Sequence, residues 1–252
     1  MSEPMGGGAE AERLRAADAP AGSGPEPASR WEDFIDIFYA PSTVFARRAT
    51  SGFFLPMVIV TLAAGALFLV NSGVWSQVME AEMTRALARQ SRTLSPEQLE
   101  RARAIGGTIS KIGVLAFIPI GIFFTGLALW LVGKLFEAKE TFGQALMIAS
   151  YAYLPRVVEG IATSIQGLVL DPSTFTGRWK LSLGLGRFLD PDTASPVLLA
   201  LLARVDVFTL WVTVLLAIGL AVVGRIPRSR AAIAGALVWV LGAVPLLLQA
   251  RR

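Results

Sequence analysis

Long apolar runs separated by charged stretches dominate the pattern of this 252-residue chain. Five runs are candidate membrane spans: 52–70, 112–132, 143–170, 207–223 and 231–248. A helix needs about 20 residues to cross a hydrocarbon core roughly 30 Å thick. The runs lack the in-out alternation of a barrel strand, and backbone amides in lipid must be bonded internally. The pattern predicts an all-α, polytopic membrane bundle of about five transmembrane helices.

Composition supports this class and removes several kinds of chemistry. Hydrophobic residues make up 54% of the chain and charged residues only 17%, and the chain contains neither cysteine nor histidine. Thiolate nucleophiles, imidazole bases and the usual zinc ligands are therefore excluded. The net charge of +4 comes mostly from arginines beside the apolar runs, which indicates interfacial anchoring. We expect no catalytic residues, cofactor, metal or nucleic-acid partner.

The segment before the first span has two parts. Residues 1–30 are rich in Ala, Gly, Pro and Glu and predict a disordered tail, so the folded domain is expected over 31–252. Large apolar residues then recur at helical spacing: Trp31, Phe34, Ile35, Phe38 and Tyr39. Glu32, Asp33 and Asp36 fall on the other side, and Pro41 is expected to end this amphipathic helix. The helix is expected in the interface plane, its aromatic residues at headgroup depth. Either it only sets the angle of the first span, or it docks a partner.

The charged connection 71–110 retains helical signals. Ser95, Pro96 and Gln98 have the pattern of an N-cap, a first-turn proline and a capping box, and Glu97 and Arg101 are spaced for an i,i+4 pair. We expect a helical hairpin on the membrane surface, with a break at 106–107, where two glycines stand together, before the second span.

Ionisable residues inside the third run are the main candidates for a polar site. Arg156 and Glu159 follow Pro155 at a spacing of i, i+3, and charges within a span are costly unless they are paired. The proline is expected to bend the helix. Three interpretations remain open: a structural ion pair, a solute pathway, or contact with a partner or lipid headgroup.

Charged residues also stand at the foot of the fourth span. Arg204 and Asp206 precede it, and Trp211 lies one turn deeper, so we expect anchoring at headgroup level. Asp190 and Asp192 form a turn sequence with Pro191. An intramembrane enzyme would have to rely on carboxylates alone, such as Glu159 or the loop acids, and is the least favoured interpretation.

Basic residues give an orientation. The short turn between the fourth and fifth spans carries several of them: Arg225, Arg228 and Arg230. Short basic loops favour the cytoplasm, which places the 133–142 loop and the N-terminus there too.

Three segments in this order resemble the Yip-domain family, integral membrane proteins whose eukaryotic members interact with Ypt/Rab GTPases. The first is FYAPSTVF, with Phe38 and Pro41, and the second is ASYAYLPRV, with Tyr151 and Pro155. The third is LLALLARVDVFTLWVTVLLAIGLAVV, with Asp206 and Trp211.

The resemblance implies a five-helix membrane domain with a cytoplasmic N-terminus, no catalytic reaction, and a role in membrane organisation or partner recruitment. The chain is similar to a prokaryotic member, which implies the inner membrane. The implied partners are the bilayer, other membrane proteins and, by resemblance alone, small GTPases. The alternative is a small-solute transporter or channel using Pro155, Arg156 and Glu159 at the bent third helix.

Overall fold

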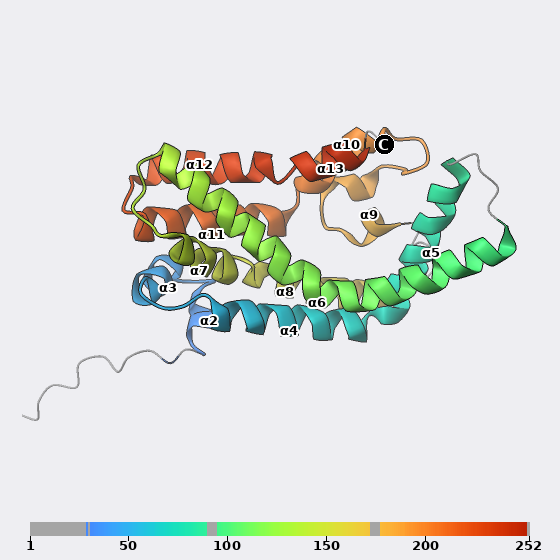
Figure 1. Ribbon diagram of the computed structural model, residues 1–252, viewed down its shortest axis with the longest axis horizontal. Coiled ribbons are helices and arrows are strands. Elements are labelled where there is room, and N and C mark those ends of the chain that lie inside the picture. The colour runs from blue at the N-terminus through green and yellow to red at the C-terminus, as the bar shows by residue number, and fades with distance from the viewer. Residues whose placement is uncertain (1–28, 30, 90–94, 172–176, 251–252) are drawn as a thin grey trace, which may run out of the picture.

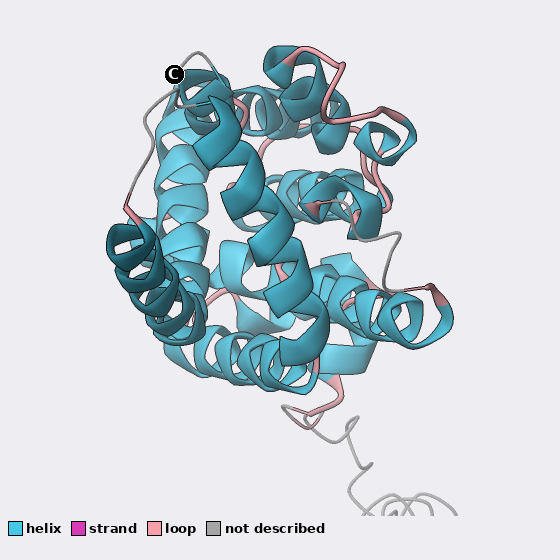
Figure 2. Cartoon of the chain, turned by 90° about the vertical axis from the view of Figure 1, so that its right-hand side faces the viewer, coloured by secondary structure: helices cyan, strands magenta, loops and turns pink. Residues whose placement is uncertain are grey.

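The computed structural model describes residues 29, 31–89, 95–171 and 177–250, and this part of the chain is helical with no strand (Figures 1 and 2). The all-α prediction is confirmed there. The predicted disordered tail lies outside the described residues apart from Ser29. The helices are α2 (Asp33–Asp36), α3 (Pro41–Arg48), α4 (Phe54–Val70), α5 (Ser72–Arg89), α6 (Pro96–Leu135), α7 (Phe142–Ala152), α8 (Leu154–Val169), α9 (Arg178–Leu181), the 3-10 helix η2 (Leu185–Phe188), α10 (Pro196–Arg204), α11 (Val207–Val223), α12 (Arg228–Leu241) and α13 (Val244–Ala250).

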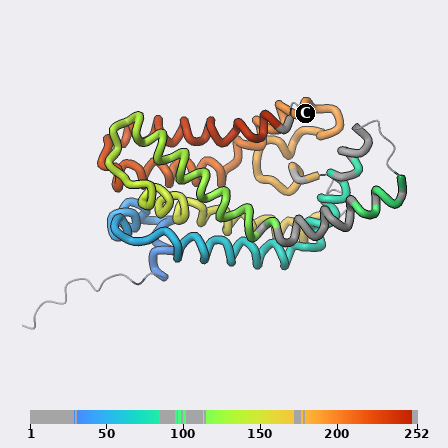
Figure 3. The backbone as a smooth tube through the Cα atoms, in the orientation of Figure 1, coloured from blue at the N-terminus to red at the C-terminus, as the bar shows by residue number. Residues whose placement is uncertain are grey.

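The chain runs back and forth along the long axis of the bundle. Successive passes are made by α4, α6, the pair α7 and α8, α11, and the pair α12 and α13 (Figure 3). The elbow helices α2 and α3 lie at one end of the bundle, and α5, α9 and the C-terminus lie at the other (Figure 1).

Some of the predicted spans are single helices in the structure, and others are divided between two helices. Two helical stretches, Leu115–Leu135 and Arg228–Leu248, have the length and apolar composition to cross a membrane by themselves. Two pairs of consecutive helices also have the necessary length and apolar composition if each pair is counted as one span. These are α4 with Ser72–Glu82, bent by 78°, and α10 with α11, bent by 54°. The described residues thus contain two to four such candidates. The remaining predicted run, 143–170, is divided between α7 and α8 at Tyr153.

The outer faces of the long helices are apolar. Leu62 on α4, Phe124 on α6, Val214 on α11 and Leu237 on α12 are all exposed. Large apolar side chains spread over the outside of a bundle are unfavourable in water, and a hydrocarbon environment removes this cost.

The helix that contains the second predicted span begins earlier than expected. Helix α6 is continuous from Pro96 to Leu135, so the break predicted at Gly106 and Gly107 is wrong. A glycine lowers helix propensity by only about 1 kcal/mol, too little to interrupt a helix stabilised on both sides. The predicted capping box at its start is confirmed, because Ser95 Oγ accepts from the Gln98 amide and Gln98 Oε1 from the Ser95 amide.

Helix α7 lies at the centre of the bundle, and residues 145–152 are all buried. Its closest neighbour is α6, and Gly126 permits the approach. A Cβ at position 126 would stand 2.7 Å from the Leu146 Cδ2 and 3.1 Å from its Cα. This packing of a small residue against a backbone is typical of helices that associate in lipid.

Candidate functional site

The N-terminal elbow, residues 31–48, consists of two short helices. The predicted single amphipathic helix is wrong in extent, because α2 has only one turn and Pro41 begins α3. Its predicted polar face is also wrong, since Asp33 is 0% exposed. The reason is that Asp33 points toward two cations on α3, and these stabilise its charge without water.

Asp33 is the centre of an ion-pair cluster that joins the two elbow helices. Arg47 Nη2 lies 2.9 Å from Asp33 Oδ1 and 2.6 Å from Asp36 Oδ2. Arg48 pairs with Asp33 Oδ2 through its Nε. The hydrogen bond to Asp36, with the nearby charge of Asp33, raises the pKa of Arg47. The hydroxyl of Tyr151 on α7 lies 3.5 Å from Asp33 Oδ2, which connects the cluster to the bundle.

The large apolar residues predicted on one face of the elbow divide into two sets. Phe34 packs against Tyr151 with ring centroids 5.8 Å apart, and Phe38 makes an edge-to-face contact with Trp211 at 5.2 Å. Trp31, Ile35 and Tyr39, spaced i, i+4, i+8, remain 71%, 63% and 85% exposed. Trp211, expected in an aromatic belt, instead supports the elbow. Trp31, Ile35 and Tyr39 therefore form a narrow exposed apolar stripe on an elbow that is held against the bundle by Phe34 and Phe38.

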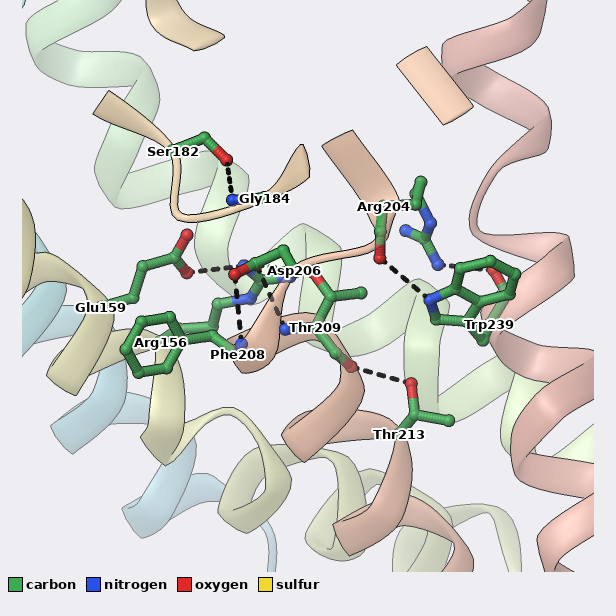
Figure 4. Close-up of polar contacts among 10 residues, drawn as sticks. All are labelled: Arg156, Glu159, Ser182, Gly184, Arg204, Asp206, Phe208, Thr209, Thr213 and Trp239. Carbon is green, nitrogen blue, oxygen red and sulfur yellow. Dashed lines mark hydrogen bonds and ion pairs between the residues drawn. The ribbon is translucent and has the colours of Figure 1, made fainter. Parts of the chain in front are cut away.

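A second polar cluster unites the residues singled out in the third and fourth spans (Figure 4). Arg156 Nη1 lies 2.6 Å from Glu159 Oε2 and 3.4 Å from Asp206 Oδ2. Arg156 Nη2 donates to Thr209 Oγ1 at 2.8 Å. Pro155 stands in the first turn of α8, where its missing N–H costs no helical bond, and the helix break beside it directs Arg156 toward α11. The sequence indicated both halves of this cluster but not their contact.

Asp206 has a second role at the start of α11. Its carboxylate accepts from the backbone amides of Phe208 and Thr209 at 3.2 Å each, and from the Thr209 hydroxyl at 2.9 Å. This is N-capping, which satisfies amides that have no partner within the helix and places negative charge at its positive end. Asp206 is buried and its carboxylate is engaged within the bundle; that it lies at headgroup level stays a prediction.

Arg204 interacts with the fifth pass. Its guanidinium lies 5.4 Å from the ring centroid of Trp239, and the Trp239 Nε1 donates to the Arg204 carbonyl oxygen at 3.3 Å. The contact ties α10 to α12, while Asp206, two residues later, caps α11.

A cavity of about 540 Å³ adjoins the Arg156 cluster. It lies between α4, α5, α6, α8 and α9, and its polar lining includes Arg156, Glu159 and Thr163 from α8. Asn71 stands at the corner between α4 and α5, where its Nδ2 donates to Ser164 Oγ at 2.6 Å. The sequence contained a signal for this face, because Arg156, Glu159, Thr163 and Gln166 recur at helical spacing.

Sequence reasoning missed a buried acid, Glu140, in the loop before α7. It is 1% exposed, and neither of its carboxylate oxygens has a hydrogen-bond partner within the described part of the chain. Burial raises the pKa of this carboxyl group. Two glycines leave space for the buried carboxylate. A Cβ at position 133 would stand 2.3 Å from Glu140 Oε1, and a Cβ at position 224 would stand 2.9 Å from Oε2. Nothing in the local sequence signals this, because the burial depends on α11 lying beside the loop.

The loop around Glu140 and the basic turn after α11 lie at the same end of the bundle. The Lys139 amide donates to the Gly224 carbonyl oxygen at 2.9 Å, and Arg230 lies 3.5 Å from Glu137. This confirms that the two loops share one side of the molecule. At this end the described residues include no group of three or more potential metal ligands, and the same holds for the rest of the described chain.

The apolar exterior, the candidate spans and the internally paired charges define an α-helical membrane protein. The chain matches the Yip1 domain family over residues 35–249, and it belongs to that family. No curated protein and no solved structure matches it. The Arg156 cluster and the cavity fall within the matched range, whereas Asp33 lies two residues before it.

Proposed function

We propose that this chain is a non-enzymatic membrane protein that crosses the bilayer five times and recruits protein partners through its elbow. The helical passes alternate in direction, and the two ends of the described chain lie at opposite ends of the bundle (Figure 1). Counting α7 and α8 as one broken span brings the number of crossings to five. The arginines of α3 and of the turn after α11 support a cytoplasmic N-terminus.

The observation that carries the proposal is the exposed stripe of Trp31, Ile35 and Tyr39 above the buried ion pairs of Asp33. A docking surface costs less entropy on binding when its supporting residues are already fixed. Trp and Tyr are also the residues that contribute most to binding hot spots. The family relationship makes a membrane-associated small GTPase the first partner to test.

The carboxylates inside the bundle favour a structural role over catalysis. Asp206 is engaged by two backbone amides, by Thr209 and by Arg156, and Glu159 is paired with Arg156. A general acid or base must reach its substrate, and Asp206 is buried with its carboxylate oxygens occupied by these donors, while Glu159 Oε2 is occupied by Arg156.

The test changes the stripe without touching the packing. In the triple variant Trp31→Ser, Ile35→Ser, Tyr39→Ser we expect loss of the proteins crosslinked from the cytoplasmic side in intact membranes, with an unchanged unfolding temperature. The matched control is Leu62→Ser, an exposed apolar residue on α4 away from the elbow. Partner recovery that is equal in the triple variant and the wild type would refute the docking role. Serine at Phe34 or Phe38 would be uninformative, because these rings pack against the bundle.

A small-solute transporter or channel is the second candidate, and the cavity beside Arg156 and Glu159 favours it. The broken helix at Tyr153 is also the kind of discontinuity that forms solute sites in transporters. In reconstituted vesicles, solute flux that is lost in Glu159→Gln would support this function. Equal leakage from vesicles with and without the protein, for every solute tested, would count against it.

A further inference from the structure

The cavity beside Arg156 has one apolar and one polar wall. Its volume of about 540 Å³ falls within the range of about 300–1,000 Å³ common for ligand sites. The apolar wall comes from α4, α5 and α6: Ala64, Leu67, Phe68, Trp75, Met79, Phe117 and Ile118. The polar side consists of Asn71, Arg156, Glu159, Thr163 and Ser182. A ligand that fills this space must itself be amphipathic.

The polar wall has hydrogen-bonding capacity to spare. Glu159 uses Oε2 for Arg156, whereas its Oε1 accepts no hydrogen bond from the described residues. Within the same part of the chain, the Thr163 hydroxyl and Asn71 Oδ1 also have no partner. The side chains of Arg156 and Glu159 are still 34% and 24% exposed, respectively, although they pair with each other. The cavity thus presents a cation and an anion side by side, with additional polar atoms.

The position of the cavity along the bundle matches the depth of lipid headgroups. Helix α4 ends at Val70, and the candidate span Leu115–Leu135 begins beside the same space. If these helices cross the bilayer, as the five-crossing arrangement requires, the cavity lies at their junction with the headgroup layer. The bend of 78° between α4 and α5 forms its outer corner.

We propose that this cavity binds a phospholipid whose headgroup carries both a phosphate and a primary amine. The phosphate lies against Arg156, and the ammonium group donates to Glu159 Oε1, while the acyl chains lie along Leu67, Phe68 and Phe117. Charge-assisted bonds to both groups select the zwitterion. A purely anionic headgroup is repelled by Glu159, and a choline headgroup has no N–H to donate.

The proposal is tested on the full chain purified in detergent, with lipid occupancy measured by native mass spectrometry. Wild-type protein is expected to bind phosphatidylethanolamine about tenfold more tightly than phosphatidylcholine or phosphatidylglycerol. In Glu159→Gln the three affinities should agree to within about twofold. The matched control is Arg228→Gln, in an apolar groove between α11 and α12, and it should retain the wild-type preference.

Two further variants separate the headgroup from the tails. Ala64→Phe places a ring in the space beside the apolar wall and should lower the occupancy of every phospholipid. Thr163→Val removes a hydroxyl from the polar wall and should reduce the preference for phosphatidylethanolamine. This second variant tests the headgroup contact if Glu159→Gln does not fold. Free phosphoethanolamine should not compete at concentrations that saturate the lipid. Equal binding of the three lipids by wild type, or a preference unchanged in both Glu159→Gln and Thr163→Val, would overturn the proposal. Competition by free phosphoethanolamine at lipid-like affinity would overturn the amphipathic site and indicate a soluble ligand.

Discussion

Arg156 and Asp206 are 50 residues apart in the sequence, yet Arg156 Nη1 lies 3.4 Å from Asp206 Oδ2. The pair joins the broken third pass to the start of the fourth. Neither charge is isolated, because Glu159 and Thr209 complete the set of contacts around Arg156. The elbow contains a comparable arrangement, in which Asp33 unites α2 with α3.

The two functions of Asp206 can be separated by substitution. Asp206→Asn keeps a capping oxygen but loses the charge facing Arg156, and should cost about 1–2 kcal/mol of stability. Asp206→Ala also removes the cap and should cost about 1 kcal/mol more. Thermal unfolding in detergent measures both. Glu97→Gln, which breaks the exposed pair with Arg101, should change stability by less than about 0.5 kcal/mol. Equal unfolding temperatures for the Asn and Ala variants would contradict the capping role.

Asp33 and Asp36 should differ strongly although both pair with Arg47. Asp33→Asn removes the buried charge that pairs with the partly buried Arg47 and Arg48, and should destabilise the protein by about 2–3 kcal/mol. Asp36→Asn affects a side chain that is partly exposed and should cost below about 1 kcal/mol. The measurement is thermal unfolding, with tryptic cleavage at Arg47 and Arg48 as a local readout. A similar loss from both substitutions would contradict the central place of Asp33.

Adjacent aromatic residues in the elbow provide a third comparison. Phe38→Ala removes the edge contact with Trp211 and should destabilise the protein by about 2 kcal/mol, because the ring is partly buried. Tyr39→Ala should change stability by less than about 0.5 kcal/mol, since the side chain is exposed. Unfolding temperatures of the two variants in the same detergent test this. The outcome that would count against the structure is a larger loss for Tyr39→Ala.

Glu140 should make stability depend on pH. Burial raises its pKa above the ordinary 4.5, so the folded protein binds this proton more tightly than the unfolded chain does. Protonation of Glu140 therefore stabilises the folded protein. This stabilisation is fully present below pH 4.5 and is lost as the pH rises through the pKa of Glu140 in the folded state. The ammonium group of Lys134 donates to the backbone oxygens of Ala138 and Glu140, and its charge only partly offsets the effect of burial on the pKa of Glu140.

In Glu140→Gln we therefore expect a flatter profile of unfolding temperature above pH 4.5, with the variant at least as stable as the wild type at neutral pH. Glu137→Gln is the matched control, because that side chain is exposed in the same loop. A wild-type slope that persists in Glu140→Gln would assign the pH dependence to other groups.

Cysteine labelling can test the proposed crossings directly, because the chain contains no cysteine of its own. Lys139→Cys and Ser229→Cys should react with a membrane-impermeant maleimide from the cytoplasmic side. Ser95→Cys and Thr193→Cys lie at the other end of the bundle and should react only from outside. Labelling of Ser95→Cys and Ser229→Cys from the same side would rule out the five-crossing arrangement.

Local patterns were sufficient for the features that depend on near neighbours. The apolar runs predicted the helices, Ser95 and Gln98 predicted the start of α6, and Pro155 predicted the break in the third run. Their physical basis is short-range, since burial in lipid, capping and the missing proline amide involve residues within one or two turns.

The contacts between distant segments were not accessible in this way. Helical spacing placed Asp33 on a polar face, but Arg47 and Arg48 draw it inward once Pro41 turns the chain back. Likewise, no residue near Glu140 in the chain indicated its burial, because Gly224 reaches it only when α11 packs beside the loop.

Hydropathy and spacing alone thus determined an all-α membrane protein, its polar residues and the order of its helical runs. Only the tertiary structure decided that Arg156, Glu159 and Asp206 form one cluster, that Asp33 is buried, and that a cavity opens beside α8. The reason is that the energy of a charge in an apolar bundle depends on which opposite charge lies within a few ångströms, and that distance is set by helix packing rather than by neighbours in the chain.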